Sequence, residues 1–148
     1  MKNSSRRKAR ECSLQMLYMF DNCDASLDVV CNTFNVNLPR VKIYRDFAMM
    51  LFLGVCHKRK VIDFFIREYA KNWELERMIV VDRNIIRIAI YEIMFNLHTP
   101  INVIINEAIE ISKKYSTEYS SKFINGMLDK LKIIRPKVKT KMRSQIVA

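Results

Sequence analysis

Glycine and proline are scarce in this chain of 148 residues, which has two glycines and three prolines. Because these residues punctuate turns and loops, their scarcity favours an all-α protein with short connections. Long apolar runs are missing as well: none reaches the length of a bilayer span, and the start has no signal-peptide core. We therefore expect a soluble, cytoplasmic protein with no membrane partner.

The residue patterns of common catalytic and metal sites are also missing. The four cysteines include no C-x-x-C pair, so we interpret them as reduced thiols. His57 and His98 are isolated, and no glycine-rich turn could bind a nucleotide. Cys56 precedes His57, but adjacent residues of a helix point about 100° apart. We expect no enzyme activity, no cofactor and no metal site.

Two glutamates on one predicted helix face require separate consideration. Glu107 and Glu110 are three residues apart, and paired carboxylates can perform acid–base chemistry. Near the start of a helix they more often complement the helix dipole or pair with lysines such as Lys113 and Lys114. We therefore interpret both as structural.

Positive charge is concentrated at the two ends of the chain. The net charge is +11, yet residues 1–10 and 135–148 each carry five cations and no acid, so the segment between them is nearly neutral. This polarity predicts a polyanionic partner, nucleic acid more than membrane. We divide the chain into a helical domain, residues 1–134, and a basic tail, residues 135–148, with too little apolar surface to order itself.

The first predicted helix, residues 5–20, combines a cation cluster with an amphipathic pattern. Its outward arc is predicted to hold Arg7, Lys8, Glu11, Gln15 and Tyr18, and its inward arc Ala9, Cys12, Ser13, Met16, Leu17 and Phe20. Single-stranded RNA requires such a mixture, because phosphates pair with cations while bases stack on rings and bond amides. A solvated basic helix face is the alternative. Cations at a helix N-terminus oppose its dipole, which an anionic partner would relieve.

The remaining helices follow from apolar periodicity. The residues around Ile85–Phe95 are apolar on almost every side, which predicts a buried central helix with Asp82 as its N-cap. Thr117 is the expected N-cap of the last helix. Gly126 interrupts the apolar stripe of that helix, so we expect a neighbouring helix to approach it closely.

Five motifs in order resemble the NusB family over residues 1 to about 134. They are R-R-K-A-R-E-C-S-L-Q-M-L-Y at 6–18, F-L-G-V at 52–55, D-R-N-I-I-R-I-A-I-Y-E at 82–92, P-I-N-V-I-I-N-E-A-I-E-I-S-K-K-Y at 100–115 and S-S-K-F-I-N-G-M-L-D at 120–129. The resemblance implies about seven helices in two packed bundles and no catalysis. It further implies binding of single-stranded boxA RNA together with ribosomal protein NusE, within an RNA polymerase antitermination complex.

The resemblance also assigns site residues. It maps RNA contacts onto two sets of positions: Lys2, Arg6, Arg7, Lys8, Arg10, Gln15 and Tyr18 in the first helix, and Lys122 and Phe123 in the last. Related sequences usually carry an acid where Tyr119 stands, so we hypothesise that Tyr119 strengthens RNA binding. NusE contacts are expected around Glu76, Asp82 and Tyr91, although apolar residues there are more often core.

Two questions stay open at the level of sequence. The alternative function is a scaffold for NusE during ribosome assembly, with ribosomal RNA contacted without sequence preference. An exposed apolar groove beside the first helix would also allow homodimers that cover the RNA face, so the choice between monomer and dimer is undecided.

Overall fold

The computed structural model describes residues 2–35, 38–70 and 74–136. The regular elements are α1 (Lys2–Asn22), α2 (Leu27–Phe34), α3 (Lys42–His57), α4 (Arg59–Tyr69), the 3-10 turn η1 (Leu75–Arg77), α5 (Val80–Phe95), α6 (Ile101–Tyr115) and α7 (Glu118–Leu131). Within the described residues every regular element is helical, which confirms the all-α prediction. Residues 137–148, most of the predicted basic tail, lie outside the described part.

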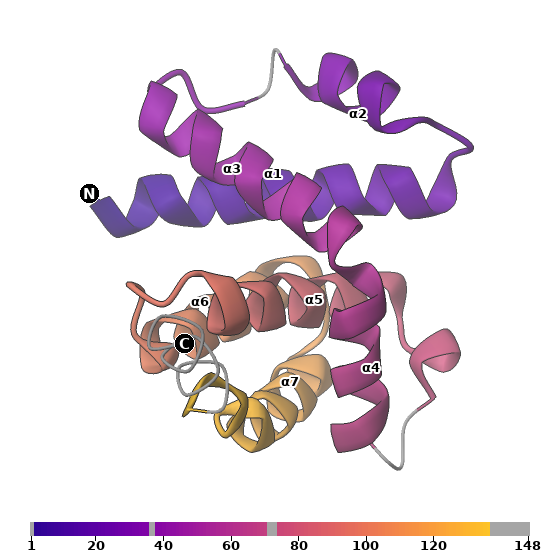
Figure 1. Ribbon diagram of the computed structural model, residues 1–148, viewed down its shortest axis with the longest axis vertical. Coiled ribbons are helices and arrows are strands. Elements are labelled where there is room, and N and C mark those ends of the chain that lie inside the picture. Colours follow the sequence, from indigo (N-terminus) through magenta and orange to yellow (C-terminus); the bar gives the residue numbers. More distant parts are fainter. Residues whose placement is uncertain (1, 36–37, 71–73, 137–148) are drawn as a thin grey trace, which may run out of the picture.

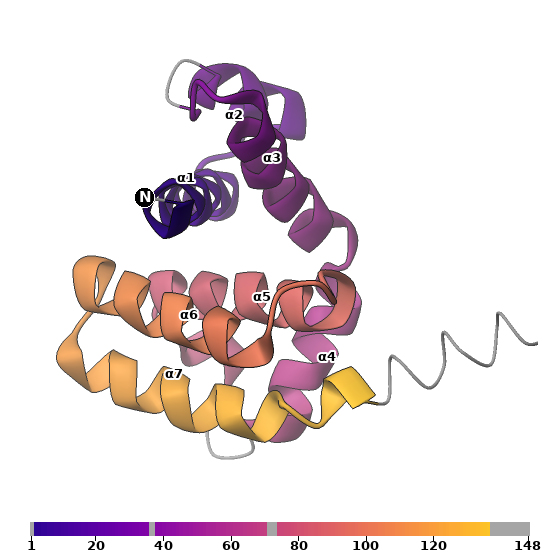
Figure 2. The ribbon, with the colours of Figure 1, turned by 90° about the vertical axis from the view of Figure 1, so that its left-hand side faces the viewer.

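The helices form two layers that meet along α1. Helices α1, α2 and α3 make one layer, and α4, α5, α6 and α7 make the other (Figures 1 and 2). Only Lys58 separates the end of α3 from the start of α4, and this pair carries the chain from the first layer to the second. Because α1 packs on α3, α5 and α6, one helix belongs to both interfaces.

Small side chains allow α1 and α3 to pack closely. Ala9, Ser13 and Ala48 are completely buried, and the Ser13 hydroxyl lies 2.9 Å from the Ala48 carbonyl oxygen. Met16 and Leu17 of α1 are buried beside them, as the predicted inward arc requires. The first layer is therefore held by close packing as well as by apolar burial.

The far end of α1 is tied to the second layer by ion pairs. Asp21 accepts a hydrogen bond from Arg59 of α4 at 2.6 Å and lies 3.3 Å from Arg87 of α5. Arg87 also donates two hydrogen bonds to Asp63 of α4, at 2.8 and 3.0 Å. One carboxylate of α1 thus links three helices, and the sequence pattern gave no sign of this.

Helix α5 lies at the centre of the second layer, as its apolar circumference predicts. Ile86, Ile90 and Ile93 have no exposed surface, and α5 contacts α1, α3, α4, α6 and α7. The predicted N-cap is wrong, because α5 begins at Val80 and places Asp82 inside the first turn. The last helix does begin as predicted, since the Thr117 side chain accepts a hydrogen bond from the Ser120 backbone N–H.

The close contact predicted at Gly126 occurs instead at the other glycine, Gly54. Gly126 is exposed, and no atom outside its own helix lies within 4 Å of the place a Cβ would take, so the predicted close approach there is wrong. Gly54 of α3 has the close neighbour, because the ring of Tyr91 on α5 fills the space of its missing side chain. Glycine at position 54 therefore lets α5 place an aromatic ring directly against α3.

Candidate nucleic-acid interface

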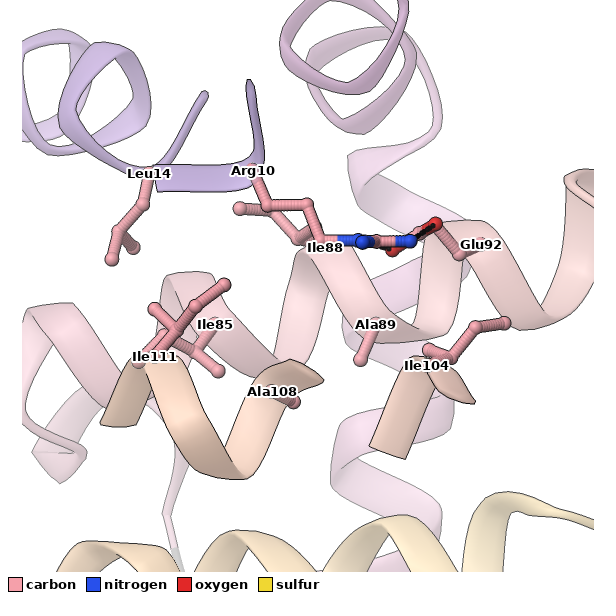
Figure 3. Close-up of a pocket in the computed structure, with 9 residues that line it drawn as sticks. All are labelled: Arg10, Leu14, Ile85, Ile88, Ala89, Glu92, Ile104, Ala108 and Ile111. Atoms are coloured by element: carbon pink, nitrogen blue, oxygen red, sulfur yellow. Dashed lines mark hydrogen bonds and ion pairs between the residues drawn. The ribbon is translucent and has the colours of Figure 1, made fainter. Parts of the chain in front are cut away.

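Arg10 belongs to the interior of the protein. Its side chain is 4% exposed, and Nε and Nη2 each donate a hydrogen bond of 2.8 Å to the carboxylate of Glu92, which is 1% exposed. Figure 3 shows this pair bridging α1 and α5 beside a small cavity lined by apolar side chains of α1, α5 and α6. The second layer covers this side of α1, so the structure gives Arg10 a buried ion pair in place of the exposed position that the predicted RNA contact assumes.

Arg7 also bonds the second layer, but its side chain stays 39% exposed. Its guanidinium donates two hydrogen bonds to Glu107 of α6, at 2.8 and 2.9 Å, and these bonds raise the pKa of Arg7. Glu110, the other glutamate of the predicted pair, accepts a hydrogen bond from Lys113 at 3.0 Å. Glu107 and Glu110 thus each form an ion pair with a different basic side chain, which agrees with a structural role for both. Only part of the Arg7 side chain remains exposed to solvent.

Lys8, Gln15 and Tyr18 form an exposed stripe on α1. Tyr18 is 49% exposed, and Gln15 Nε2 lies 3.4 Å from the hydroxyl of Tyr115 at the end of α6. We call Lys8, Gln15, Tyr18 and Tyr115 together the α1–α6 face. Glu11, predicted to be outward on the same arc, is instead buried, and it bonds Lys114 of α6 at 3.2 Å. A cation, an amide and two rings are therefore presented together.

Arg6 lies on the other side of α1. Positions 6 and 8 of a helix point roughly 200° apart. The Arg6 guanidinium accordingly lies 6.0 Å from the ring centroid of Phe47 on α3, away from Lys8. Lys2 is within α1, but its side chain is outside the described part of the structure. The predicted cation cluster is thus divided among separate environments.

An apolar groove runs beside the α1–α6 face. It lies among α1, α2, α5 and α6 and is lined by Leu14, Gln15, Tyr18, Met19, Cys23, Phe34, Val81 and Tyr115. Three of the four residues of the α1–α6 face, Lys8, Gln15 and Tyr18, were predicted as RNA contacts, and two of these, Gln15 and Tyr18, also line the groove. Tyr115 was missed, because its place in the sequence does not show that the end of α6 meets the middle of α1.

The start of α7 presents a second group of predicted residues. Tyr119 is 76% exposed, Lys122 is exposed and Phe123 is partly buried. A shallow groove beside them is lined by Arg77, Met78, Ile79, Asp82, Thr117, Tyr119, Ser120 and Phe123. Arg77 and Ile79 are exposed and come from the segment before α5, and sequence reasoning did not single them out.

The three residues predicted for a protein partner do not share one surface. Glu76 is exposed and bonds Arg67 at 3.0 Å. Asp82 is 5% exposed, and its two carboxylate oxygens each accept a 2.7 Å hydrogen bond, from Ser116 and Ser120. Tyr91 follows nine residues later on the opposite side of α5, about 13 Å along the axis. Asp82 therefore holds the α6–α7 connection, and little of its side chain is exposed for the partner contact predicted there.

Arg135 is buried, although the sequence assigns it to the basic tail. Its guanidinium donates hydrogen bonds to the carbonyl oxygens of Glu92, Ile93, Asn96 and Thr99, at 2.6 to 3.2 Å. The Ile93 carbonyl is one of those that the end of α5 leaves without a helical partner, and the others belong to Glu92 and to the α5–α6 connection. Burial lowers the pKa of Arg135, and the charge of Glu92 opposes this effect. The ordered body thus extends past residue 134.

The other reactive groups of the described residues include the thiol of Cys56. Burial raises the pKa of the Cys56 thiol to about 11, which opposes thiolate formation at neutral pH. No group of three His, Cys, Asp or Glu side chains in the described ranges could hold a metal ion. The described helices also include none that is long and apolar enough to cross a membrane.

Comparison with known proteins identifies close relatives. The model of the NusB family matches residues 7–132. Transcription antitermination protein NusB of Trichlorobacter lovleyi is 47% identical over 126 residues, which cover 85% of this chain and 89% of the relative. The corresponding protein of Thermodesulfovibrio yellowstonii is 40% identical over 138 residues, covering 85% and 90%.

Solved structures share the fold. T. maritima NusB superposes with a TM-score of 0.77 at 36% identity, covering 86% of this chain and 89% of that one. A structure of antitermination factors NusB and NusE in complex with dsRNA gives a TM-score of 0.79 at 21% identity, covering 88% and 98%. The second likeness extends to the fold alone.

Proposed function

This chain belongs to the NusB family, and from that membership we propose that it is a non-enzymatic antitermination factor that binds boxA RNA together with NusE. Its curated relatives are transcription antitermination proteins. In the structure of NusB and NusE with dsRNA, a protein of this fold occurs with both kinds of partner, which is the reason to test NusE and RNA here. In this proposal the assembled complex acts on RNA polymerase.

The observation that carries the proposal is the composition of the α1–α6 face. Lys8 offers a charge for phosphate, Gln15 an amide for base edges and Tyr18 an exposed ring for stacking. Tyr115 is partly buried, with the ammonium of Lys114 5.3 Å from its ring centroid, and adds its hydroxyl beside Gln15. Single-stranded RNA is bound by this combination, because phosphate contacts supply affinity while amide and ring contacts supply base preference. The exposed edge of Arg7 extends the cationic surface toward the start of α1, whereas Arg6 lies on the other side of the helix.

The start of α7 supplies the second part of the proposed RNA site. Tyr119 is the most exposed large ring described in the protein, and Lys122 is exposed one turn along the helix. Base–aromatic stacking contributes about 1–3 kcal/mol per base. Tyr119→Asp should therefore weaken boxA binding several-fold or more, by removing the ring and adding a negative charge. A Tyr119→Asp variant that binds as tightly as the parent would exclude Tyr119 from the site.

The function is tested by comparing boxA RNA with a scrambled strand and with a duplex, each with and without NusE, at two salt concentrations. We expect boxA to bind most tightly and NusE to increase that preference. Lys8→Gln should lower affinity and reduce the log–log salt slope by about 0.7. Lys60→Gln is the matched control, because Lys60 is an exposed lysine of α4, away from the α1–α6 face.

The competing function is a NusE scaffold with unspecific ribosomal RNA contact. Equal binding of boxA and scrambled RNA, unchanged by NusE, would favour the scaffold, whereas a NusE-dependent preference for boxA would favour antitermination. For the NusE contact we propose the exposed surface around Glu76 and Arg77, because Asp82 is buried and Tyr91 lies on another side of α5.

A further inference from the structure

A second open groove lies on the side of α1 that carries Arg6. It runs between α3 and the α5–α6 connection, has a volume of about 550 Å³, and is lined by Arg6, Ile43, Tyr44, Asp46, Phe47, Met50, Asn96, His98 and Thr99. Ile43 is 64% exposed and Met50 is 40% exposed. The proposed RNA and NusE contacts leave this groove unused, because Arg6 faces away from Lys8 and the α1–α6 face.

The apolar surface of the groove continues along α3 to α5. Ile43, Phe47, Met50 and Gly54 recur at helical spacing, so they share one face of α3. Tyr91 packs on Gly54, and Phe95, 41% exposed, lies next to Tyr91 with ring centroids 5.1 Å apart. Ile43, Met50 and Phe95 are exposed, and Phe47, Gly54 and Tyr91 are partly buried between them. Exposed apolar side chains gathered in a strip of this kind are typical of a protein-interaction surface, and methionine and aromatic residues are enriched at such surfaces.

The charges around this strip favour an acidic occupant. Arg6 lies at one end, and the ammonium of Lys58 lies 5.5 Å from the ring centroid of Phe95 at the other. Lys42 is exposed one turn before Asp46, the one acid among the lining residues described. Residues 137–148 carry four cations, so the rim repels the chain's own tail.

RNA fits the charge of the strip but not its surface. Stacking needs an open ring face, yet the guanidinium of Arg10 lies over Phe47 at 5.2 Å and that of Arg6 at 6.0 Å. Lys58 occupies the corresponding place on Phe95. The most exposed lining side chain, Ile43, is aliphatic and offers neither a ring nor a hydrogen bond.

We propose that the α3–α5 groove binds an amphipathic helical segment of a partner protein, with apolar side chains on one face and Asp or Glu beside them. The apolar ridge of α3 would pack against the apolar face of that helix, as helices commonly dock into apolar grooves. The flanking carboxylates would meet Arg6, Lys42 and Lys58. This site is separate from the α1–α6 face, so the protein would bind RNA and this segment at the same time.

A displayed library of 16-residue peptides, with apolar residues fixed at helical spacing and random flanks, tests the proposal. The library is selected on the full-length protein and counter-selected on Met50→Glu. Val103→Glu is the matched control, because Met50 and Val103 are both 40% exposed and Val103 lies on α6. We expect Asp and Glu to be enriched in the flanks. The best peptide should bind Met50→Glu at least tenfold more weakly and Val103→Glu equally well.

Other outcomes overturn the proposal. One is enrichment of Lys and Arg in the peptide flanks, a composition that the chain's own tail shares. Another is that every selected peptide binds Met50→Glu as tightly as it binds the parent protein. Loss of a dimer in Met50→Glu by sedimentation would identify a second copy as the occupant, and loss of boxA binding would identify RNA. Because boxA binding should be unchanged in Met50→Glu, failure of this proposal leaves the proposed antitermination function separately testable.

Discussion

Basic residues lie on two sides of α1, the side covered by the second layer and the side open to solvent, and they have different roles there. On the covered side the guanidinium of Arg10 donates two hydrogen bonds, from Nε and Nη2, to the buried carboxylate of Glu92. On the open side Lys8 reaches water two residues earlier in the chain. A cation that is paired in the interior contributes to folding, and one left in water is available to a partner. Neighbouring positions in a basic cluster therefore need not share a function.

The largest expected effect comes from breaking the covered side. Arg10→Met would leave the buried carboxylate of Glu92 without its charge partner, and such losses cost about 3–5 kcal/mol of unfolding free energy. Urea denaturation followed by circular dichroism measures the change. A loss below about 1 kcal/mol would mean that the pair is not buried as described.

The double variant Arg10→Met/Glu92→Leu sharpens that test. Replacing both members of a buried ion pair with apolar residues is often neutral or stabilising. We expect the double variant to recover most of the stability that Arg10→Met loses. If it is as unstable as the single variant, packing of the arginine rather than the unpaired charge explains the loss.

Arg135 extends the comparison to the other basic end of the chain. Arg135→Met removes the donors to four backbone carbonyls around the end of α5, and hydrogen bonds to a charged group contribute about 1.5–3 kcal/mol each before relaxation. We expect a net loss of about 2–4 kcal/mol in the same denaturation assay. If the free energy of unfolding falls by less than about 0.5 kcal/mol, as for an ordinary surface residue, Arg135 is not part of the folded body.

The two glycines allow the same comparison without charge, because Gly54 faces a neighbouring side chain and Gly126 faces none. Gly54→Ala would push a Cβ into the ring of Tyr91, and we expect it to destabilise by about 1–2 kcal/mol. Gly126→Ala meets no neighbour and should stabilise by about 0.5–1 kcal/mol. Thermal unfolding of the two variants compares them directly. If both substitutions raise the free energy of unfolding, the ring of Tyr91 moves aside for the new Cβ at little energetic cost.

The smallest effect is expected for an ion pair in water. Arg67 and Glu76 bond at 3.0 Å, but their side chains are 56% and 70% exposed. Such pairs contribute about 0–1 kcal/mol, so Arg67→Met should change the unfolding free energy by less than about 0.5 kcal/mol. A change comparable to that of Arg10→Met would remove burial as the explanation for the difference between the two pairs.

Periodicity predicted the helices because it is a local property. The apolar circumference of α5 and the Thr117 cap depend on residues a few positions apart, and the structure confirms both. The predicted N-cap of α5, Asp82, lies three residues after the observed N-cap, Ile79. Asp82 has the residue type of a cap, but its carboxylate bonds serines that lie 34 and 38 residues later in the chain.

The site was only partly predictable, because burial of a polar residue depends on distant segments. The partner of Arg10 lies 82 residues away and that of Arg7 lies 100 residues away. Both carry the charge and hydrophilicity of the exposed Lys8, and no spacing rule separates them. The same reason explains Arg135, whose acceptors lie 36 to 43 residues earlier.

The most direct test measures boxA affinity and unfolding free energy for Lys8→Met and Arg10→Met, which place the same side chain on the open and covered sides of α1. Affinity is referred to the folded fraction of each variant. We expect Lys8→Met to weaken RNA binding and reduce its salt slope while its stability stays within about 0.5 kcal/mol of the parent. Arg10→Met should lose stability and keep its affinity per folded molecule. The reverse result, with Arg10→Met losing RNA affinity at unchanged stability, would contradict the division of α1 into a structural and an RNA-binding side.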